Sequence, residues 1–389
     1  MDSLQHRYRN DSTVTDLLHE HQQTVKAAAL LHDVGHGPFS HVMERAFQAL
    51  RRHEGTTISI IVTARSAVFK VLEQHNMDPR SVADIIDKVS PHRLLVDIVS
   101  SQLDADRMDY ILRDALATGV KYGAFDAEWL INSLCIGSEP GVSTVAGEKH
   151  WRLCLEEKRG LHSAEQLVIA RMHMSLQVYF HRATRGWEAH LLSLFRLAAD
   201  LAAENRLPGK TPPIVRRFFE QKGELKHGDL LLFDEATLIS ALQIWSSISG
   251  KRFERLSDLA TGFLRRERSF LCRELTPLGF VNATALEREL SRNGRNGIDW
   301  LLDEIPFNSY EDFGAVFRQK NTAEDEEQKA QVSTGAILLS SGKAGSASNP
   351  IETDSMLFQT LGQKPLPSIT RLFYHRTMQK SVSKVLEHF

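Results

Sequence analysis

The chain has 389 residues, of which 42% are hydrophobic and 25% are charged, and these proportions are ordinary for a globular protein. A formal net charge of −2 excludes a strongly basic protein that coats nucleic acid, so nucleic acid is not an expected partner. No run of about 18 apolar residues occurs, so we expect no membrane association. Three cysteines without C-x-x-C spacing predict free thiols and a cytoplasmic location: Cys135, Cys154 and Cys272.

Helical periodicity is the main structural signal in chain order. The apolar residues of 15–31 predict a helix, and the glycines and proline of HDVGHGPFSH predict its interruption after His32. Short apolar runs between glycines predict a β-hairpin near 130–155. Further helices are expected over 39–50, 57–74, 81–88, 94–116, 164–199, 229–246 and 256–273.

The last part of the sequence differs in composition. Residues 321–354 begin with an acidic run and end with SSGKAGSASNP, which predicts a mobile loop. After it, ITRLFYHR predicts a strand and MQKSVSKVLEHF a closing helix. We therefore expect a mainly α fold with a small antiparallel β element and a C-terminal α+β extension. The expected divisions are a metal-site region over 1–125, a substrate-pocket continuation over 126–300 and an extension over 301–389.

The first chemical signal is the pair His32-Asp33 in LLHDVGHGPFSH. An imidazole nitrogen and a carboxylate oxygen together suit Mn, Fe, Zn or Ni and leave coordination positions open to water. An isolated His-Asp pair is more often a surface pair. Here His36 and His41 follow within nine residues across a tight Gly/Pro turn. Three histidines clustered after an apolar helix favour a metal centre over core packing.

The second signal is the string QLDADRMDYILRD. On a helix, Asp106, Asp109, Tyr110 and Arg113 recur at spacings of three and four and share a face. A solvated helix with surface ion pairs would give the same pattern. The functional alternative places one carboxylate on the metal and uses the neighbouring arginine and tyrosine to hold phosphate.

Together, these two strings closely resemble the HD-domain phosphohydrolases, most of all the SAM-and-HD-domain deoxynucleoside triphosphate triphosphohydrolase and the bacterial dGTPase-like proteins. The resemblance extends to HEGTTISIIV and to EEKRGLHSAEQLVIARMHMSLQVYFHRATRGWEAHL, and it covers roughly residues 25 to 190. It implies an HD-domain helical fold. It also implies hydrolysis of deoxynucleoside triphosphates to deoxynucleoside and inorganic triphosphate, by attack of metal-activated water at the α-phosphate.

The resemblance also assigns roles to residues. The expected metal ligands are His32, Asp33 and Asp106. The expected catalytic residues are His36, His41 and Glu44. The expected substrate-binding residues are His53, Arg107, Tyr110, Asp114, Arg171 and Tyr179. For the last two, packing on a long amphipathic helix is an equal alternative.

Cofactor and partners follow from the same resemblance. One divalent metal ion is expected (Mn, Mg, Fe, Zn or Ni), together with a deoxynucleoside triphosphate substrate. The family also suggests a homo-oligomer and a nucleotide effector. The basic stretches RRFFEQK and FLRRER are candidate effector contacts, although solvated helix faces commonly look the same.

One feature departs from the family pattern. The family has a further metal-ligand histidine well upstream of the His-Asp pair, in a string resembling TRFEHS. Only 31 residues precede His32, and no such string is present. His19 and His21 lie on the helix leading into the motif, and we expect neither to replace that ligand. We therefore expect a shortened N-terminus. The alternatives are an HD hydrolase that acts on another nucleotide or phosphate ester, or a degenerate HD domain that only binds nucleotides.

Overall fold

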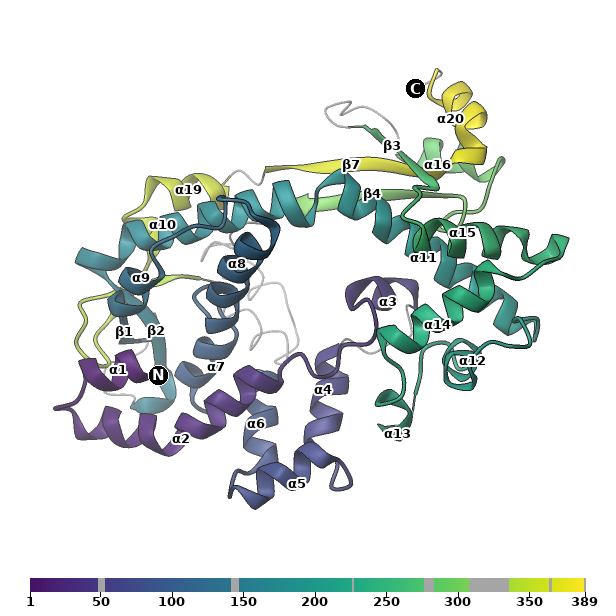
Figure 1. Ribbon diagram of the computed structural model, residues 1–389. Coiled ribbons are helices and arrows are strands. Elements are labelled where there is room, and N and C mark those ends of the chain that lie inside the picture. The colour runs from purple at the N-terminus through teal and green to yellow at the C-terminus, as the bar shows by residue number, and fades with distance from the viewer. Residues whose placement is uncertain are drawn as a thin grey trace. The chain divides into compact units, whose positions relative to one another are not determined.

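The computed structural model describes residues 1–47, 53–140, 147–225, 227–275, 283–307, 336–363 and 366–387. They fall into two compact units (Figure 1). The first unit contains Met1–Val34, Thr57–Val178 and Asn308–Leu366, and the second contains Gly35–Thr56, Tyr179–Phe307 and Pro367–Phe389. Helices predominate and the sheets are small, which confirms the expected fold class.

The helices of the first unit are short except for α2 and α10. They are α1 (Asp2–Arg7), α2 (Ser12–Leu31), α5 (Ala67–Gln74), α6 (Pro79–Ile86), α7 (Arg93–Val99), α8 (Ala105–Thr118), α9 (Ala127–Ser133), α10 (Glu157–Met174) and α19 (Met356–Gln363), with 3₁₀ turns at Glu148–His150 and Ile351–Thr353. Helix α4 (His53–Val62) begins in the second unit and ends in the first.

Two segments that were predicted as single helices are each divided. The segment 57–74 breaks between α4 and α5, where Ser66 accepts a hydrogen bond from the Phe69 backbone N–H at 2.8 Å and so caps α5. The segment 94–116 breaks between α7 and α8, where Asp104 caps α8 by accepting from the Arg107 N–H at 2.7 Å. Apolar periodicity continues across both caps, so the pattern alone does not reveal the breaks.

The first unit contains a four-stranded sheet in the order β1-β2-β5-β6. Strands β1 (Leu134–Ser138) and β2 (Trp151–Glu156) pair antiparallel, as expected for a hairpin in this region. Strand β5 (Leu338–Ser340) pairs parallel with β2 and antiparallel with β6 (Ser348–Pro350). Both lie in the segment 321–354 that was expected to be a mobile loop. The buried run Ile337, Leu338 and Leu339 supplies an apolar strand there, whereas residues 321–335 lie outside the described part of the chain.

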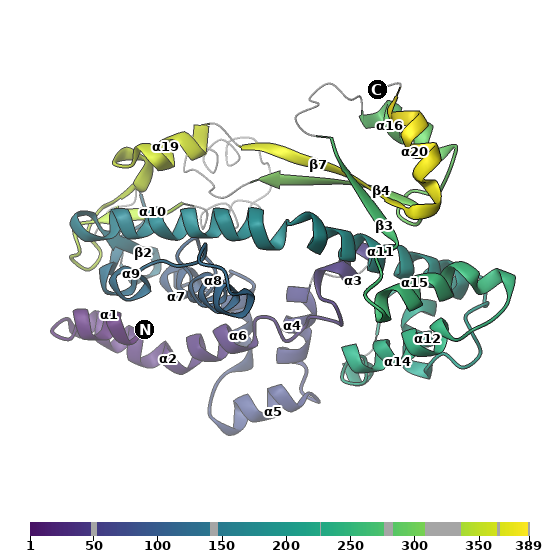
Figure 2. The ribbon, with the colours of Figure 1, turned by 45° about the horizontal axis from the view of Figure 1, so that its top comes forward.

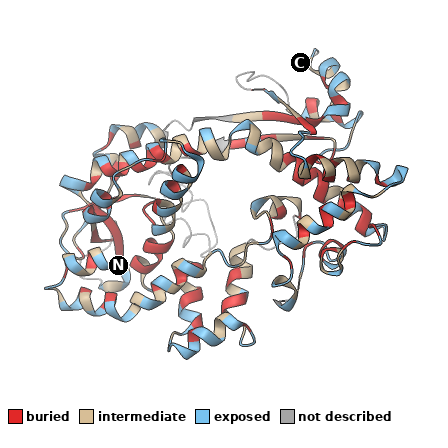
Figure 3. Ribbon diagram, in the orientation of Figure 1, coloured by how far each residue is buried: buried red, intermediate tan, exposed pale blue. Residues whose placement is uncertain are grey.

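The second unit packs helices around one large apolar core. Its helices are α3 (His41–Ala46), α11 (Arg182–Ala203), α12 (Pro213–Glu220), α13 (His227–Leu230), α14 (Glu235–Ser246), α15 (Glu254–Leu264), α16 (Ala283–Ser291) and α20 (Gln379–Leu386), with 3₁₀ turns at Lys251–Phe253 and Arg376–Met378. In α14, buried residues recur every three or four positions and exposed ones lie between them (Figure 3). The core joins α3, α11, α12, α14 and α15.

A three-stranded sheet, ordered β3-β7-β4, completes the second unit (Figures 1 and 2). Its strands are β3 (Phe270–Glu274), β4 (Trp300–Phe307) and β7 (Leu366–His375). The strand predicted at ITRLFYHR is part of β7, and the predicted closing helix is α20. By contrast, the helix predicted over 256–273 ends with α15 at Leu264, and its last residues form β3, where Phe270 and Cys272 pair with β7.

The long predicted helix over 164–199 is also interrupted. Helix α10 ends at Met174, a π-helical turn covers Ser175–Tyr179, and α11 begins at Arg182. Among the described residues, no single helix is long and apolar enough to span a membrane. Helices α4 and α5 would reach that length and apolarity only as a pair bent by 54°.

Candidate functional site

The first group of candidate residues lies at the end of α2, in the first unit. The apolar side chains Val14, Leu17 and Leu18 are buried, so α2 is held by its packing. At its C-terminal end, the carbonyl oxygen of His32 accepts a hydrogen bond from Thr57 Oγ1 at 2.9 Å. This contact fixes the backbone from which the His-Asp pair projects.

The His32 ring faces two carboxylates. Its Nε2 lies 3.3 Å from Asp33 Oδ1 and 3.5 Å from Asp106 Oδ1. Asp106 lies in the first turn of α8, two residues after the buried cap Asp104. The structure thus brings the three residues expected as metal ligands to a common point, although Asp106 is separated from the pair by more than seventy positions in the sequence.

The other ring nitrogen of His32 is also fixed. Its Nδ1 donates to the Ala29 carbonyl at 2.9 Å, which is the arrangement that directs Nε2 toward a metal in many metalloproteins. The hydrogen bond with Asp106 raises the pKa of His32 to about 9, against the opposing effect of burial. In the absence of a cation the proton on Nε2 balances the two carboxylates. One imidazole nitrogen and two carboxylate oxygens make a donor set that fits a divalent metal.

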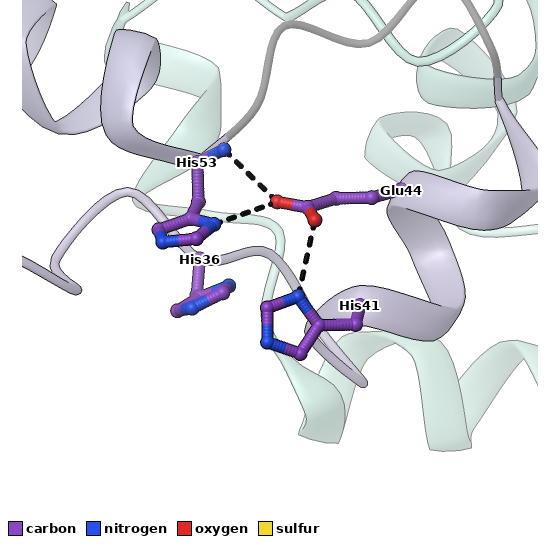
Figure 4. Close-up of side chains that lie close together, drawn as sticks. All are labelled: His36, His41, Glu44 and His53. Atoms are coloured by element: carbon purple, nitrogen blue, oxygen red, sulfur yellow. Dashed lines mark hydrogen bonds and ion pairs between the residues drawn. The ribbon is translucent and has the colours of Figure 1, made fainter. Parts of the chain in front are cut away.

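The second group lies in the second unit and is shown in Figure 4. Glu44, on α3, is placed between two histidines: its Oε2 accepts from His41 Nδ1 at 3.1 Å, and its Oε1 accepts from His53 Nδ1 at 3.0 Å. The backbone N–H of His53 also donates to Oε1, at 2.9 Å. The ring of His36 stacks on that of His53 with centroids 3.7 Å apart. We call His36, His41, Glu44 and His53 the histidine cluster.

The hydrogen bonds of the histidine cluster have an electrostatic consequence. Burial alone would raise the pKa of Glu44, but the hydrogen bonds from His41 and His53 outweigh it and lower that pKa. Glu44 is therefore an ionised acceptor that fixes the Nδ1–H form of both rings. The cluster can move a proton through the Nε2 of His41. Its four donor atoms lie within 4.8 Å of one another, so by donor type they could also hold a cation.

A strained turn presents the histidine cluster. Phe39 and Ser40 have φ values of 57° and 43°, in the left-handed region that non-glycine residues rarely adopt. The Phe39 ring packs on Phe195 and Phe263, with centroids 6.2 and 5.6 Å away. Strain of this kind persists only where the surrounding packing holds it, and it is frequent near functional residues.

The residues expected to bind substrate in the first unit surround Tyr110. Burial raises the pKa of Tyr110, and the charges of Arg171 and Arg107 oppose that rise, so both guanidinium groups lie near its ring. Arg107 is tied to the buried carboxylate of Asp104. Arg171 Nη1 donates to Gln102 Oε1 at 2.8 Å. Positive charge near Asp106, an expected metal ligand, would suit a phosphate group.

Helix α8 has a half-buried face and a solvated face. Asp106, Tyr110 and Asp114 recur every four residues and are half-buried. Asp109 and Arg113 instead form an ion pair whose side chains are each 63% exposed, as the alternative of a solvated face predicts for them. The structure thereby excludes this pair from the group around Tyr110.

Several expected or missed residues complete the description. Tyr179 ends the π-helical turn and falls in the second unit, whereas Arg171 falls in the first, and the substrate role of Tyr179 stays a prediction. The ring of His21 packs against His92 with centroids 5.1 Å apart. Sequence reasoning missed Gln102, whose amide carries no motif of its own and is revealed only by its contact with Arg171.

Comparison with known proteins agrees with this geometry. Residues 7–114 match the family model of the HD domain. The chain is 36% identical over 242 residues to the uncharacterized protein YwfO of Bacillus subtilis. The matched region covers 62% of this chain and 51% of YwfO. It is 35% identical over 114 residues to the metal-dependent phosphohydrolase cns2 of Cordyceps militaris, covering 28% of this chain and 30% of that one. The chain spans about half the length of the first curated relatives it matches.

Solved structures share the fold. A phosphohydrolase from Bacteroides thetaiotaomicron superposes with a TM-score of 0.64 at 24% identity, covering 91% of this chain and 80% of that one. A hypothetical protein from Aquifex aeolicus superposes with a TM-score of 0.62 at 22% identity, covering 99% and 82%. At this level of identity the likeness concerns the fold alone.

Proposed function

We propose that this chain, whose residues 7–114 match the family model of the HD domain, is a metal-dependent phosphohydrolase and that its substrates are deoxynucleoside triphosphates. The observation that carries the proposal is the convergence of Asp33 and Asp106 on the Nε2 of His32, at 3.3 and 3.5 Å. A divalent metal held by these three residues would supply Lewis acidity, which polarises a phosphoryl oxygen and makes water a stronger nucleophile.

The arginines of the first unit support a phosphate ester as the substrate. Arg107 and Arg171 both act on Tyr110, which lies one helical turn after the ligand Asp106. Guanidinium groups bind phosphate oxygens through paired N–H donors and remain charged at every physiological pH. In the proposed reaction they neutralise the non-bridging oxygens of the polyphosphate, while the half-buried Tyr110 lies against the sugar and favours deoxyribose.

The histidine cluster supports acid–base chemistry at the leaving group. Glu44 stays ionised and holds the Nδ1–H of His41, so the Nε2 of His41 is the atom that can exchange a proton. We assign this nitrogen to protonation of the departing 5′ oxygen. The products of the proposed reaction are a deoxynucleoside and inorganic triphosphate.

Product analysis of the purified chain tests the proposal. The chain is incubated with dGTP and Mn²⁺ or Mg²⁺, and deoxyguanosine and triphosphate are separated by anion-exchange chromatography. Asp106→Asn removes one ligand charge. Asp109→Asn is the matched control because Asp109 lies on the same helix, is largely exposed and pairs with the surface residue Arg113.

We expect triphosphate release by the wild type and the Asp109→Asn variant, with a loss of more than about a hundredfold in Asp106→Asn. Release of orthophosphate or pyrophosphate in place of triphosphate would support an HD hydrolase with another specificity. Binding of dGTP without turnover at any metal would contradict the enzymatic proposal and favour a nucleotide-binding HD protein.

A further inference from the structure

The helix that carries His41 and Glu44 is held by an ion-pair network in the second unit. Arg45, the next residue on α3, donates from Nη1 to Glu188 Oε2 at 3.1 Å and from Nη2 to Asp303 Oδ1 at 3.1 Å. Arg185, on α11, donates from Nε to Asp303 Oδ2 at 2.8 Å and also contacts Glu188. Two arginines and two carboxylates thus form a closed group of four charges.

Asp303 is the most buried member of this group. Its side chain is 3% exposed, against 35% for Arg45. It lies on β4, more than 250 positions after Arg45 in the sequence, and both of its oxygens accept from arginines. A carboxylate buried this deeply is stable only when positive groups balance its charge. The ion pairs with Asp303 therefore also fix the positions of Arg45 and Arg185.

Helix α3 needs such an external anchor. It has only six residues, and isolated helices of that length do not form in water. Its N-cap residue Ser40 makes no side-chain capping bond and has a positive φ. The apolar side of α3 is fixed by Met43 in the core, whereas Glu44 and Arg45 project from other sides. Arg45 is therefore a polar contact that sets the rotation of α3, in addition to the contact of Glu44 with His53.

We propose that Asp303, in the C-terminal part of the chain, is a positioning residue that acts through Arg45 to hold Glu44 between His41 and His53. Asp303 touches neither substrate nor metal in this role. The proposal rests on the proposed function for the identity of the reaction, but the placement of α3 is a property of the folded protein alone.

The effect of losing Asp303 follows from charge. With Asn at this position, Glu188 alone faces two guanidinium groups, and burial already raises the pKa of Glu188 against the effect of Arg185 and Arg45. The side-chain amide in Asp303→Asn keeps one acceptor oxygen, so one hydrogen bond to an arginine is lost and Arg45 no longer faces a buried negative charge. A loss of this kind corresponds to about a tenfold change or more in the local opening equilibrium of α3. A small rotation of α3 misaligns His41, and misplacement of this kind lowers turnover more than binding.

The test compares Asp303→Asn with a matched control, Asp299→Asn. Asp299 lies just before β4 in the same unit and pairs with Arg255 at 3.0 Å, outside the network around α3. Hydrogen exchange of peptides spanning 39–46 is measured by mass spectrometry on the full chain, together with kcat and KM for triphosphate release. Arg45→Met is the second variant, because it leaves the contacts of Arg185 with Asp303 and Glu188 in place should Asp303→Asn fold poorly.

We expect exchange in 39–46 to rise about tenfold in Asp303→Asn and Arg45→Met and to stay within about twofold of wild type in Asp299→Asn. We expect kcat to fall about tenfold in the first two variants, with KM changed by less than about threefold. Unchanged exchange in 39–46 in both variants would overturn the proposal, as would an equal effect of Asp299→Asn. A wild type without turnover would refute the proposed function, and the exchange comparison would still decide the role of Asp303.

Discussion

Replacement of Glu44 by glutamine tests the central relay of the histidine cluster. The substitution keeps the shape of the side chain and removes its charge. Because Glu44 Oε1 accepts from both the N–H and the Nδ1–H of His53, the glutamine oxygen should remain on that side. The –NH₂ group of the glutamine then faces the Nδ1–H of His41. Both groups are hydrogen-bond donors, so the hydrogen bond between residues 41 and 44 is lost.

The magnitude follows from what His41 loses. To accept a hydrogen bond from the glutamine amide, the His41 ring must carry its proton on Nε2 instead of Nδ1. When His41 is protonated on both nitrogens, no carboxylate faces its positive charge. Loss of the carboxylate behind a catalytic histidine lowers kcat by about 10²–10⁴, or roughly 3–5 kcal/mol of barrier. Stability should fall by only about 1–2 kcal/mol, because the Glu44 side chain is 26% exposed and two of its three hydrogen bonds survive.

The assay combines turnover, metal content and acid unfolding. We expect kcat to fall at least a hundredfold while metal per chain is unchanged, since His32, Asp33 and Asp106 are untouched. The pKa of Glu44 is lowered in the folded state. Its carboxylate therefore stabilises the fold above the ordinary pKa of glutamate, and this stabilisation is lost as the pH falls through the pKa of the folded state. The stability gap between wild type and variant should therefore narrow on acidification. A kcat within threefold of wild type would refute the relay, and loss of metal would identify the histidine cluster as the metal centre.

Three further outcomes are expected. Metal affinity, measured by calorimetry, should rise between pH 6 and 8. The reason is that the pKa of His32 is about 9, so its Nε2 must release a proton before it can bind a metal. An affinity that does not change with pH would contradict this prediction. Asp97→Asn should lower the free energy of unfolding by about 3–5 kcal/mol, since it leaves Arg152 buried without its charge partner. The double variant Asp97→Leu/Arg152→Met should regain much of the lost free energy of unfolding, as measured by denaturant titration. If it regains none, the unpaired buried charge is not the cause of the loss. Gly137→Ala should lower the melting temperature because its Cβ would lie 2.7 Å from Cys154 Sγ; an unchanged melting temperature would mean that the sheet relaxes freely.

Local signals in the sequence predicted much of the architecture. Short apolar runs between glycines predicted the hairpin of β1 and β2, and the string ITRLFYHR predicted part of the strand β7. The resemblance carried by the His-Asp pair and the later aspartates indicated Asp33 and Asp106, whose Oδ1 atoms lie 3.3 and 3.5 Å from His32 Nε2. The predictions of the hairpin and of the strand were confirmed because each depends on neighbours within a few residues.

The remaining features depend on contacts between distant residues. Nothing near Asp303 in the sequence indicates that it meets Arg45, and nothing near Gln102 indicates that it meets Arg171. The continuous helical pattern of 164–199 hides a π-helical turn, because one extra residue in a turn leaves the apolar composition unchanged. The strand β3 was predicted as helix for a similar reason: its partner β7 lies about a hundred residues later and decides its conformation.

The sheet of the first unit has a consequence for the order in which the chain folds during synthesis. Strand β5 pairs with β2, but about 180 residues, including most of the second unit, are translated between them. Until Leu338–Ser340 leaves the ribosome, one edge of β2 has no strand beside it and exposes its backbone N–H and C=O groups. Pairing across so long an interval is slow, since a large loop must close first. At about 5–20 residues per second, the nascent protein therefore spends roughly 10 to 40 seconds with one edge of β2 accessible to non-native strands and to chaperones.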